Sequence, residues 1–204
     1  MMLSEADGRR IEEAVRALEK TSATELVVAV VPRSADYWRA RLVVAVAWSL
    51  AAAHAMLQFR PDSAPYVAVL LQVPVGVATF VLFGRGALAR LLIPKGAAAE
   101  AAERRALELF AAHGLTRTRD RTGMLILVSE LEHRVVILGD RGIHERVGDA
   151  GWRDHVDHVI AAIRRGEPAR GLLDVIERLG AAHAEQNPAR KDDTNELPDE
   201  IVRG

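Results

Sequence analysis

The chain has 204 residues, a formal net charge of −1 and no cysteine. A charge so close to zero disfavours a general nucleic-acid-binding protein, because such proteins carry an excess of Lys and Arg. The absence of cysteine excludes disulfides, thiol catalysis and thiolate metal ligands. The first long apolar run begins near residue 42, behind a charged segment, so we expect no cleavable signal peptide.

A helix and a strand are predicted at the start of the chain. Ser4 is followed three residues later by Asp7, which resembles a capping box and predicts the beginning of a helix. Its apolar residues recur at helical spacing, at Ile11, Val15 and Leu18. The β-branched run that stops at Pro32 predicts a strand over residues 25–31 that is buried on both faces.

Two uncharged apolar stretches follow, over residues 42–59 and 66–83. Each is close to the length that a helix needs to cross a bilayer core, and the short loop 60–65 joins them. We therefore predict a transmembrane hairpin; the alternative is a buried helical pair in a soluble protein. Basic residues flank the spans and predict that both flanks are cytoplasmic and the loop lies outside. These residues are Arg33, Arg39, Arg41, Arg85, Arg90 and Lys95.

Polar residues inside the two spans predict contacts between them. His54 and Gln72 fall at similar depth when the hairpin is folded about its loop, so we expect a hydrogen bond between the helices. Ser49 and Gly76 also fall at matching depth and would let the helices approach closely. A proton or ion relay is the alternative, but it needs more ionisable groups along a path. Two helices cannot enclose a pore, so a channel would require oligomers.

The second half of the chain alternates between helices and strands. An alanine-rich helix is predicted over residues 97–113 with Gly114 as its C-cap. Apolar runs at 124–129 and 134–140 predict a β-hairpin, which we expect to join the first strand in one sheet covered by helices. Two further helices are marked by apolar stripes that begin at Trp152 and Leu172, and the tail from residue 186 loses all periodicity.

Acidic residues follow the third predicted strand, at Asp140, Glu145 and Asp149. Strand ends are where α/β sheets commonly place a ligand crevice, so these residues are candidate ligands for a divalent cation such as Ca²⁺ or Mg²⁺. Alternatively they form a solvated turn in which Asp140 acts as a cap and Asp149 begins the next helix. Arg121 and Arg141 are candidate ligands for an anion or a phosphate group.

Other signals for catalysis are weak. His155 and His158 stand at i, i+3 on a predicted helix, but no further zinc ligands accompany them, so we favour a half-exposed helix face. Ser129 lacks the G-x-S-x-G context of a nucleophile elbow. The sequence contains no Walker or dinucleotide-binding glycine pattern.

The segment RTGMLILVSELEHRVVILGDRGI, which begins at Arg121, resembles the TPM domain. The VGDAGW and GEPARGL segments that follow it resemble the same domain, and so does the opening helix and strand. The resemblance covers roughly residues 1–38 and 97–185 and is closest to a bacterial branch in which a membrane hairpin interrupts the domain. It implies an α/β fold, an αβα sandwich with an inserted two-helix transmembrane hairpin. The chain then divides into 1–38, the hairpin at 39–93, 97–185 and a flexible tail at 186–204.

The resemblance also bears on activity. Some family members are associated with divalent-cation binding and acid phosphatase activity, and others with the modulation of membrane complexes. Secreted members carry an acidic residue just before the glycine that opens the second strand, where this chain has Arg121. Their Gly-aromatic-Gly-Leu-Glu turn is Asp140 to His144 in this chain, and only Asp149 falls on an expected acid. Two acids of the family's site are thus replaced by Arg and His.

We therefore expect a bacterial inner-membrane protein with both termini in the cytoplasm and the loop 60–65 in the periplasm. Its TPM-like domain would act as an interaction or regulatory module for another membrane component. The resemblance suggests a LemA-type protein or a TPM paralogue as the partner, beside the lipid bilayer. The alternative is a divalent-cation-dependent phosphatase that acts on phosphate monoesters, in which the acidic residues hold the ion and Arg121 or Arg141 orients the phosphate.

Overall fold

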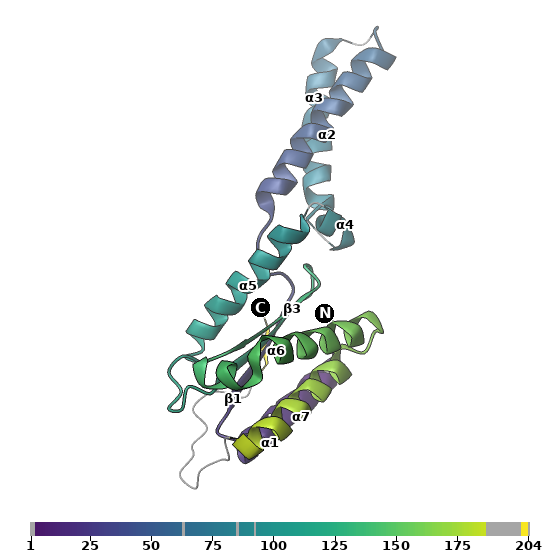
Figure 1. Ribbon diagram of the computed structural model, residues 1–204. Helices are drawn as coiled ribbons and strands as arrows, with labels where there is room; N and C mark the ends of the chain where they lie inside the picture. The colour runs from purple at the N-terminus through teal and green to yellow at the C-terminus, as the bar shows by residue number, and fades with distance from the viewer. Residues whose placement is uncertain (1–2, 63, 85, 92, 187–200, 204) are drawn as a thin grey trace. The chain divides into compact units, whose positions relative to one another are not determined.

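The computed structural model describes residues 3–62, 64–84, 86–91, 93–186 and 201–203 (Figure 1). Side chains are described throughout these ranges except at 86–87, 144–151, 183–186 and 203. The chain divides into two compact units. One unit combines Met1–Ser34 with Ala99–Gly204, and the other is Ala35–Ala98.

The first unit is a mixed α/β domain. Its helices are α1 (Glu5–Thr21), most of α5 (Lys95–Ala112), α6 (Arg141–Arg164) and α7 (Pro168–Gln186). Its strands are β1 (Glu25–Val31), β2 (Gly123–Ser129), β3 (Arg134–Gly139) and β4 (Val202–Arg203), which form one sheet in the order β3-β2-β1-β4.

The central strands β1 and β2 run parallel, with their register running from Glu25 opposite Gly123 to Val31 opposite Ser129. A parallel pair needs a long crossover connection, and the residues between β1 and β2 supply it. The second unit and α5 both lie within that connection. β3 pairs with β2 in the antiparallel direction, as expected for two strands joined by a short turn.

Helices cover both faces of the sheet. On one face, side chains from β1, β2 and β3 pack against α1, α6 and α7, which lie together on that side (Figure 1). On the other face, alternate residues of the same strands pack against α5, through Ala106, Leu109 and Phe110. Every residue of β1 and β2 is therefore buried, which confirms the prediction that residues 25–31 form a strand buried on both faces.

Local signals set the ends of two helices as predicted. The Ser4 side chain accepts a hydrogen bond from the Asp7 backbone amide at 3.1 Å, and the Asp7 carboxylate accepts one from the Ser4 amide at 3.2 Å. This reciprocal pair is the capping box expected at the start of α1. Gly114, which follows α5, adopts a positive φ of 71°, the left-handed conformation typical of a residue that ends a helix.

The last helices and the tail differ from the expectations drawn from the sequence. α6 begins at Arg141 with Asp140 as its N-cap, so Asp149 lies inside a continuous helix and does not start one. The apolar stripe becomes regular only at Trp152, because glycines interrupt the preceding residues, yet Ile143 in the first turn is fully buried. The tail returns to the sheet as β4, where Val202 pairs with Ala29, although its sequence indicates no strand. Residues 187–200 of the predicted flexible tail lie outside the described residues.

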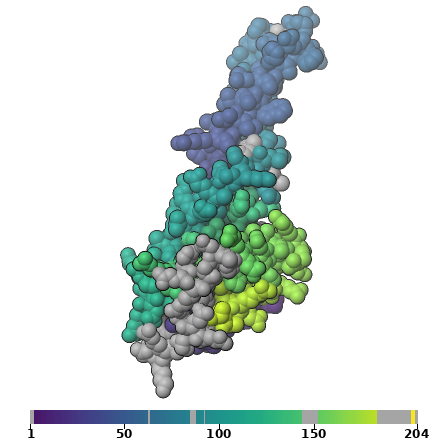
Figure 2. Space-filling model, in the orientation of Figure 1, coloured from purple at the N-terminus to yellow at the C-terminus, as the bar shows by residue number. Residues whose placement is uncertain are grey.

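The second unit is an antiparallel pair of long helices followed by a short one: α2 (Trp38–Phe59), α3 (Pro65–Leu82) and α4 (Gly86–Leu91). At about 1.5 Å per residue, α2 is roughly 33 Å long and α3 roughly 27 Å, close to the thickness of a bilayer core. By length and composition, both helices could cross a membrane. Large apolar side chains on both are exposed, including Val43 at 66 % and Val73 at 69 %, and they form the outer surface of the hairpin, drawn in blue in Figure 2.

Small residues let α2 and α3 pack against each other. Ala45, Ser49 and Ala53 recur every four residues along α2 and are buried. A Cβ placed on Gly76 of α3 would lie 3.7 Å from the Cβ of Ser49, so the two helices approach closely at the predicted pair. At the end of the hairpin opposite the loop, the Arg41 side chain donates hydrogen bonds to the Phe80 carbonyl oxygen at 3.0 and 3.3 Å. These bonds fasten the start of α2 to the end of α3.

Candidate functional site

Asp140 lies at the opposite edge of the sheet from the one expected for a ligand crevice. In parallel sheets that crevice forms at the carboxyl ends of the strands. Because β3 is antiparallel to β2, its last residue, Gly139, pairs beside Met124 near the start of β2. The Asp140 amide also donates to the Gly123 carbonyl oxygen at 2.8 Å. Asp140 is therefore placed at the amino-terminal edge of β1 and β2.

The structure brings Arg121 and Asp140 together. Arg121 Nη1 lies 3.5 Å from Asp140 Oδ2, and the two side chains differ greatly in exposure, at 63 % and 11 %. The other carboxylate oxygen of Asp140 accepts a hydrogen bond from the Arg141 amide at 2.7 Å, as a helix N-cap does. Arg121 also donates to the Thr116 carbonyl oxygen at 3.2 Å. Two of the residues that the sequence singled out, Arg121 and Asp140, thus form an ion pair with each other.

A compact turn holds this ion pair in place. Arg121 has a φ of 56°, in the left-handed region that a non-glycine residue rarely adopts. Its carbonyl oxygen accepts from the Gly142 amide at 3.2 Å, and a Cβ at Gly142 would lie only 2.8 Å from that oxygen. Thr122 next to it donates its hydroxyl to the Ala23 carbonyl oxygen. Glycine is therefore required at position 142 so that α6 can begin against this turn.

The other two candidate metal ligands lie further along α6. The side chains of Glu145 and Asp149 are outside the described residues, so their part in a metal site stays a prediction. The helix backbone is continuous from Arg141 to Arg164. At about 1.5 Å of rise per residue, Asp149 stands roughly 13 Å along the axis from Asp140, which disfavours a single ion that contacts both carboxylates.

The described residues contain no group of three or more His, Asp or Glu side chains that could hold a metal ion. The N-terminus of α6, which would attract an anion, already holds the Asp140 carboxylate. An incoming phosphate group would have to compete with that carboxylate for both the helix end and Arg121. The arrangement supports a structural junction between β2, β3 and α6 better than a phosphate receptor.

The two histidines of α6 have separate environments. His158 Nε2 lies 3.2 Å from Asp174 Oδ2 and so links α6 to α7. His155 Nδ1 is buried and has no hydrogen-bond partner in the described part of the chain. Burial lowers the pKa of His155 below its usual value, although the nearby Asp154 carboxylate opposes this shift and Arg178 adds to it. Of the two histidines, His158 thus takes part in the contact between α6 and α7.

Sequence reasoning missed a polar cluster at the carboxyl ends of β1 and β2. Ser129 donates to Glu132 Oε2 at 2.5 Å, Ser34 donates to Ser129 Oγ at 2.8 Å, and the Ser34 amide donates to Glu132 Oε1 at 3.0 Å. Ser129 is fully buried and Glu132 is 5 % exposed. Two backbone bonds, from Glu130 to Val31 and from Leu131 to Pro32, add to the junction.

This Ser34–Ser129–Glu132 cluster is a structural clamp by its geometry. It ties the turn between β2 and β3 to the segment that leaves β1 toward the second unit, and Ser34 is the last residue of the first unit before that segment. No local pattern in the sequence distinguishes Glu132 from Glu130, because both are acidic and both lie in the turn between β2 and β3. The only sequence signal is that an acid follows the end of a buried strand.

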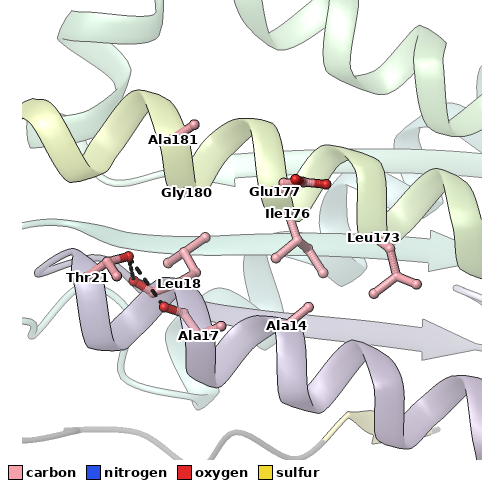
Figure 3. Close-up of a pocket in the computed structure, with 9 residues that line it drawn as sticks. All are labelled: Ala14, Ala17, Leu18, Thr21, Leu173, Ile176, Glu177, Gly180 and Ala181. Atoms are coloured by element: carbon pink, nitrogen blue, oxygen red, sulfur yellow. Dashed lines mark hydrogen bonds between the residues drawn. The ribbon is translucent and has the colours of Figure 1, made fainter.

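A surface pocket of about 400 Å³ lies between α1 and α7 (Figure 3). It forms because small side chains line both helices, at Ala14, Ala17, Gly180 and Ala181. Glu177 is the charged residue among those that line it, and Thr21 turns its hydroxyl back onto the α1 carbonyl oxygens of Ala17 and Leu18. One carboxylate without a partner acid, base or nucleophile does not make a catalytic site.

The predicted polar pair in the hairpin differs in exposure. His54 is exposed on α2 and Gln72 is half-buried on α3. The hydrogen bond between them stays a prediction. The helix contact at Ser49 and Gly76, by contrast, is present as expected.

Comparisons with known proteins find one matching family profile and a similar solved structure. Residues 87–182 match the family profile described as the TPM domain. The chain is also similar to the NMR structure of the BA42 protein from the psychrophilic bacterium Bizionia argentinensis, with 22 % sequence identity and a TM-score of 0.62. That similarity covers 99 % of this chain and 95 % of BA42, and at this level of identity it shows the fold alone. Comparison with curated proteins finds no match.

Proposed function

Because residues 87–182 of this chain form a TPM domain, we propose that the protein is a membrane-anchored TPM-domain protein that regulates another membrane component. The α2–α3 hairpin inserts into the bacterial inner membrane, and the loop 60–65 reaches the periplasm. Both termini and the TPM domain face the cytoplasm. The partner is a membrane protein, and the family resemblance suggests a LemA-type protein or a TPM paralogue.

The observation that carries this proposal is the apolar surface of α2 and α3. In the most apolar window of each helix, only 17 % and 6 % of the residues are buried. A helical pair in a soluble core would bury most of such a surface, because contiguous exposed apolar area is costly in water. A lipid environment removes that cost and leaves the backbone hydrogen bonds satisfied within the helices.

The role as an interaction module is supported by the chemistry of the domain. The candidate acid and base at its best-defined polar turn, Asp140 and Arg121, are paired with each other. The buried carboxyl group at the opposite edge, Glu132, is bonded to two serines and holds a chain segment in place. Both groups have structural contacts of this kind, so we propose that the domain acts by binding a partner.

Topology is tested with a reporter that is active only in the periplasm. Fused after Gly204, it should be inactive, and inserted into the loop 60–65 it should be active. The protein should also resist extraction from membranes at alkaline pH. An active reporter after Gly204 would refute the cytoplasmic placement, and release at alkaline pH would refute the insertion of α2 and α3.

The alternative function, a cation-dependent phosphatase, is tested by thermal unfolding of the detergent-purified protein with Ca²⁺, Mg²⁺ and Mn²⁺. A ligand that binds only the native state raises the unfolding midpoint. We expect no cation-specific rise. Asp140→Ala and Asp149→Ala are measured beside the parent, each against its own ion-free midpoint, because loss of the Asp140 cap is itself destabilising. A rise that disappears in both variants would support the phosphatase and overturn the interaction module.

The partner is sought with photo-crosslinkers placed on the exposed surface of the TPM domain in cells. A crosslink to a LemA-type protein or to a TPM paralogue would support the proposal. Crosslinks that fail to yield any membrane protein, at every surface position tried, would contradict it.

A further inference from the structure

Positive charge gathers at one end of the α2–α3 hairpin. In the unit Ala35–Ala98, the residues just before α2, its first turn and the residues that follow α3 in the sequence include five basic residues and one acidic residue, which are Arg39, Arg41, Arg85, Arg90, Lys95 and Asp36. The loop at the other end carries Arg60 and Asp62, whose charges cancel. The two ends of the same helical pair therefore differ in formal charge by four.

Two arginines at the charged end make different contacts. Arg41 bonds to the Phe80 carbonyl oxygen, and its guanidinium carbon lies 4.2 Å from the centre of the Phe80 ring, so it fastens the two helices. Arg39 instead lies over Trp38, at 5.6 Å from the centre of the ring, and Trp38 is 48 % exposed. A tryptophan beside an arginine at the end of an apolar helix is typical of the headgroup region of a bilayer.

The short helix α4 follows α3 in the chain. Leu88 and Leu91 are exposed, at 37 % and 77 %, while Ala89 between them is buried and Arg90 is exposed. The helix therefore combines apolar side chains with a basic one directly after the end of α3. Apolar and basic groups on one short helix suit the boundary between acyl chains and headgroups.

We propose that this charged end of the hairpin is a binding surface for anionic phospholipid headgroups in the leaflet next to the TPM domain. The inference rests on the membrane insertion proposed above. Insertion places the basic side chains at the depth of the lipid phosphates, where their attraction to anionic lipids is strongest. Soluble polyanions have the same phosphate chemistry, but they lack the acyl chains that the exposed side chains of Leu88, Leu91 and Trp38 would contact in a bilayer. The protein thus selects anionic lipid around its anchor.

Fluorescence quenching in nanodiscs tests the proposal with the full-length chain. The background variant Trp48→Phe with Trp152→Phe leaves Trp38 as the one tryptophan, since the chain has three. Brominated phosphatidylglycerol and brominated phosphatidylcholine are compared as quenchers at equal mole fraction. We expect the anionic lipid to quench Trp38 about twofold more strongly at low salt, and the difference to shrink in high salt because salt screens these charges. Equal quenching by both lipids at low salt would overturn the proposal.

Charge variants show whether the basic residues cause the selection. Replacing Arg39, Arg90 and Lys95 together by Gln should abolish the preference for the anionic lipid. Arg60→Gln at the other end of the hairpin is the matched control and should leave it unchanged. A preference that survives the triple substitution, or is lost in the control, would refute the assignment to this end.

A second single-tryptophan chain separates the two proposals. With Trp38→Phe and Trp152→Phe, the remaining Trp48 reports on α2 itself, where its side chain is 57 % exposed. Quenching of Trp48 by both lipids supports insertion whatever the behaviour of Trp38. If neither lipid quenches Trp48, the proposed insertion fails and the lipid selection fails with it. If Trp48 is quenched and Trp38 shows no preference, only the lipid selection fails.

Discussion

Glu132 is the residue whose removal should destabilise the TPM domain most clearly among its polar groups. Its carboxyl group accepts hydrogen bonds from the Ser129 hydroxyl and from the Ser34 amide, and its side chain is almost fully buried. The substitution Glu132→Ala removes both acceptors but leaves both donors in place. A buried donor without an acceptor costs about 1–3 kcal/mol, and the half-buried Ser34 amide, which water can reach, costs less.

The expected loss in the free energy of unfolding is therefore about 2–4 kcal/mol for Glu132→Ala. Glu132→Gln keeps one carbonyl oxygen and should lose about 1–2 kcal/mol, because one of the two donors then faces an amide NH₂ group. The control is Glu103→Ala on the exposed surface of α5, for which we expect a change within about 0.5 kcal/mol.

The assay is denaturant unfolding of the full-length protein in detergent, followed by the fluorescence of Trp152. Trp38→Phe and Trp48→Phe are present in every variant, so that the signal comes from the α/β domain alone. The double variant Ser129→Ala with Glu132→Ala should lose little more free energy of unfolding than Glu132→Ala alone, because the hydrogen bond between the two side chains is already lost in the single variant. If Glu132→Ala and Glu103→Ala lose the same small amount, the cluster does not clamp the domain.

Three further predictions concern the other elements. Burial lowers the pKa of His155, so below about pH 6.5 the unfolded state binds the proton more readily than the folded state, and the free energy of unfolding should fall as the pH is lowered. His155→Gln should make the free energy of unfolding less dependent on pH in this range. An unchanged dependence on pH in the variant would contradict the burial effect. Ser4→Ala should lower the free energy of unfolding by about 1 kcal/mol, because it removes the N-cap of α1. Hydrogen bonds with Ser4 lower the pKa of Asp7, so the substitution should also raise that pKa. An NMR titration that shows no change in the pKa of Asp7 would count against the capping box. Gly76→Ala should leave the thermal unfolding midpoint of the hairpin nearly unchanged, because the added carbon makes an ordinary contact with Ser49. Gly76→Leu should lower the midpoint, because its side chain does not fit between α2 and α3. Equal midpoints for the two variants would argue against close packing of the helices.

Local patterns predicted the elements whose structure depends on neighbouring residues in the chain. The Ser4 cap, the buried strand β1, the helix end at Gly114 and the turn between β2 and β3 are all visible as short motifs. The apolar stretches also predicted two long helices with exposed apolar surfaces, at α2 and α3. These features follow from hydrogen bonds and side-chain periods that extend over a few residues.

The candidate site could be predicted only in part. The sequence singles out Arg121 and Asp140 as separate ligands for an anion and a cation, and the structure pairs them with each other. Their pairing depends on the antiparallel register of β2 and β3, which brings residues 121 and 140 to one edge of the sheet. The start of α6 at Arg141 was missed because glycines obscure the apolar period ahead of Trp152.

By itself, the sequence determined that this protein has an α/β domain interrupted by an apolar helical hairpin, because composition and periodicity are local properties of the chain. Only the tertiary structure decided which polar groups meet. Ser34 and Glu132 are 98 residues apart in the chain and are joined at the carboxyl ends of two parallel strands. Val202 returns from the end of the chain to pair with Ala29. Contacts between such distant residues are set by strand order and register, which no short stretch of sequence contains.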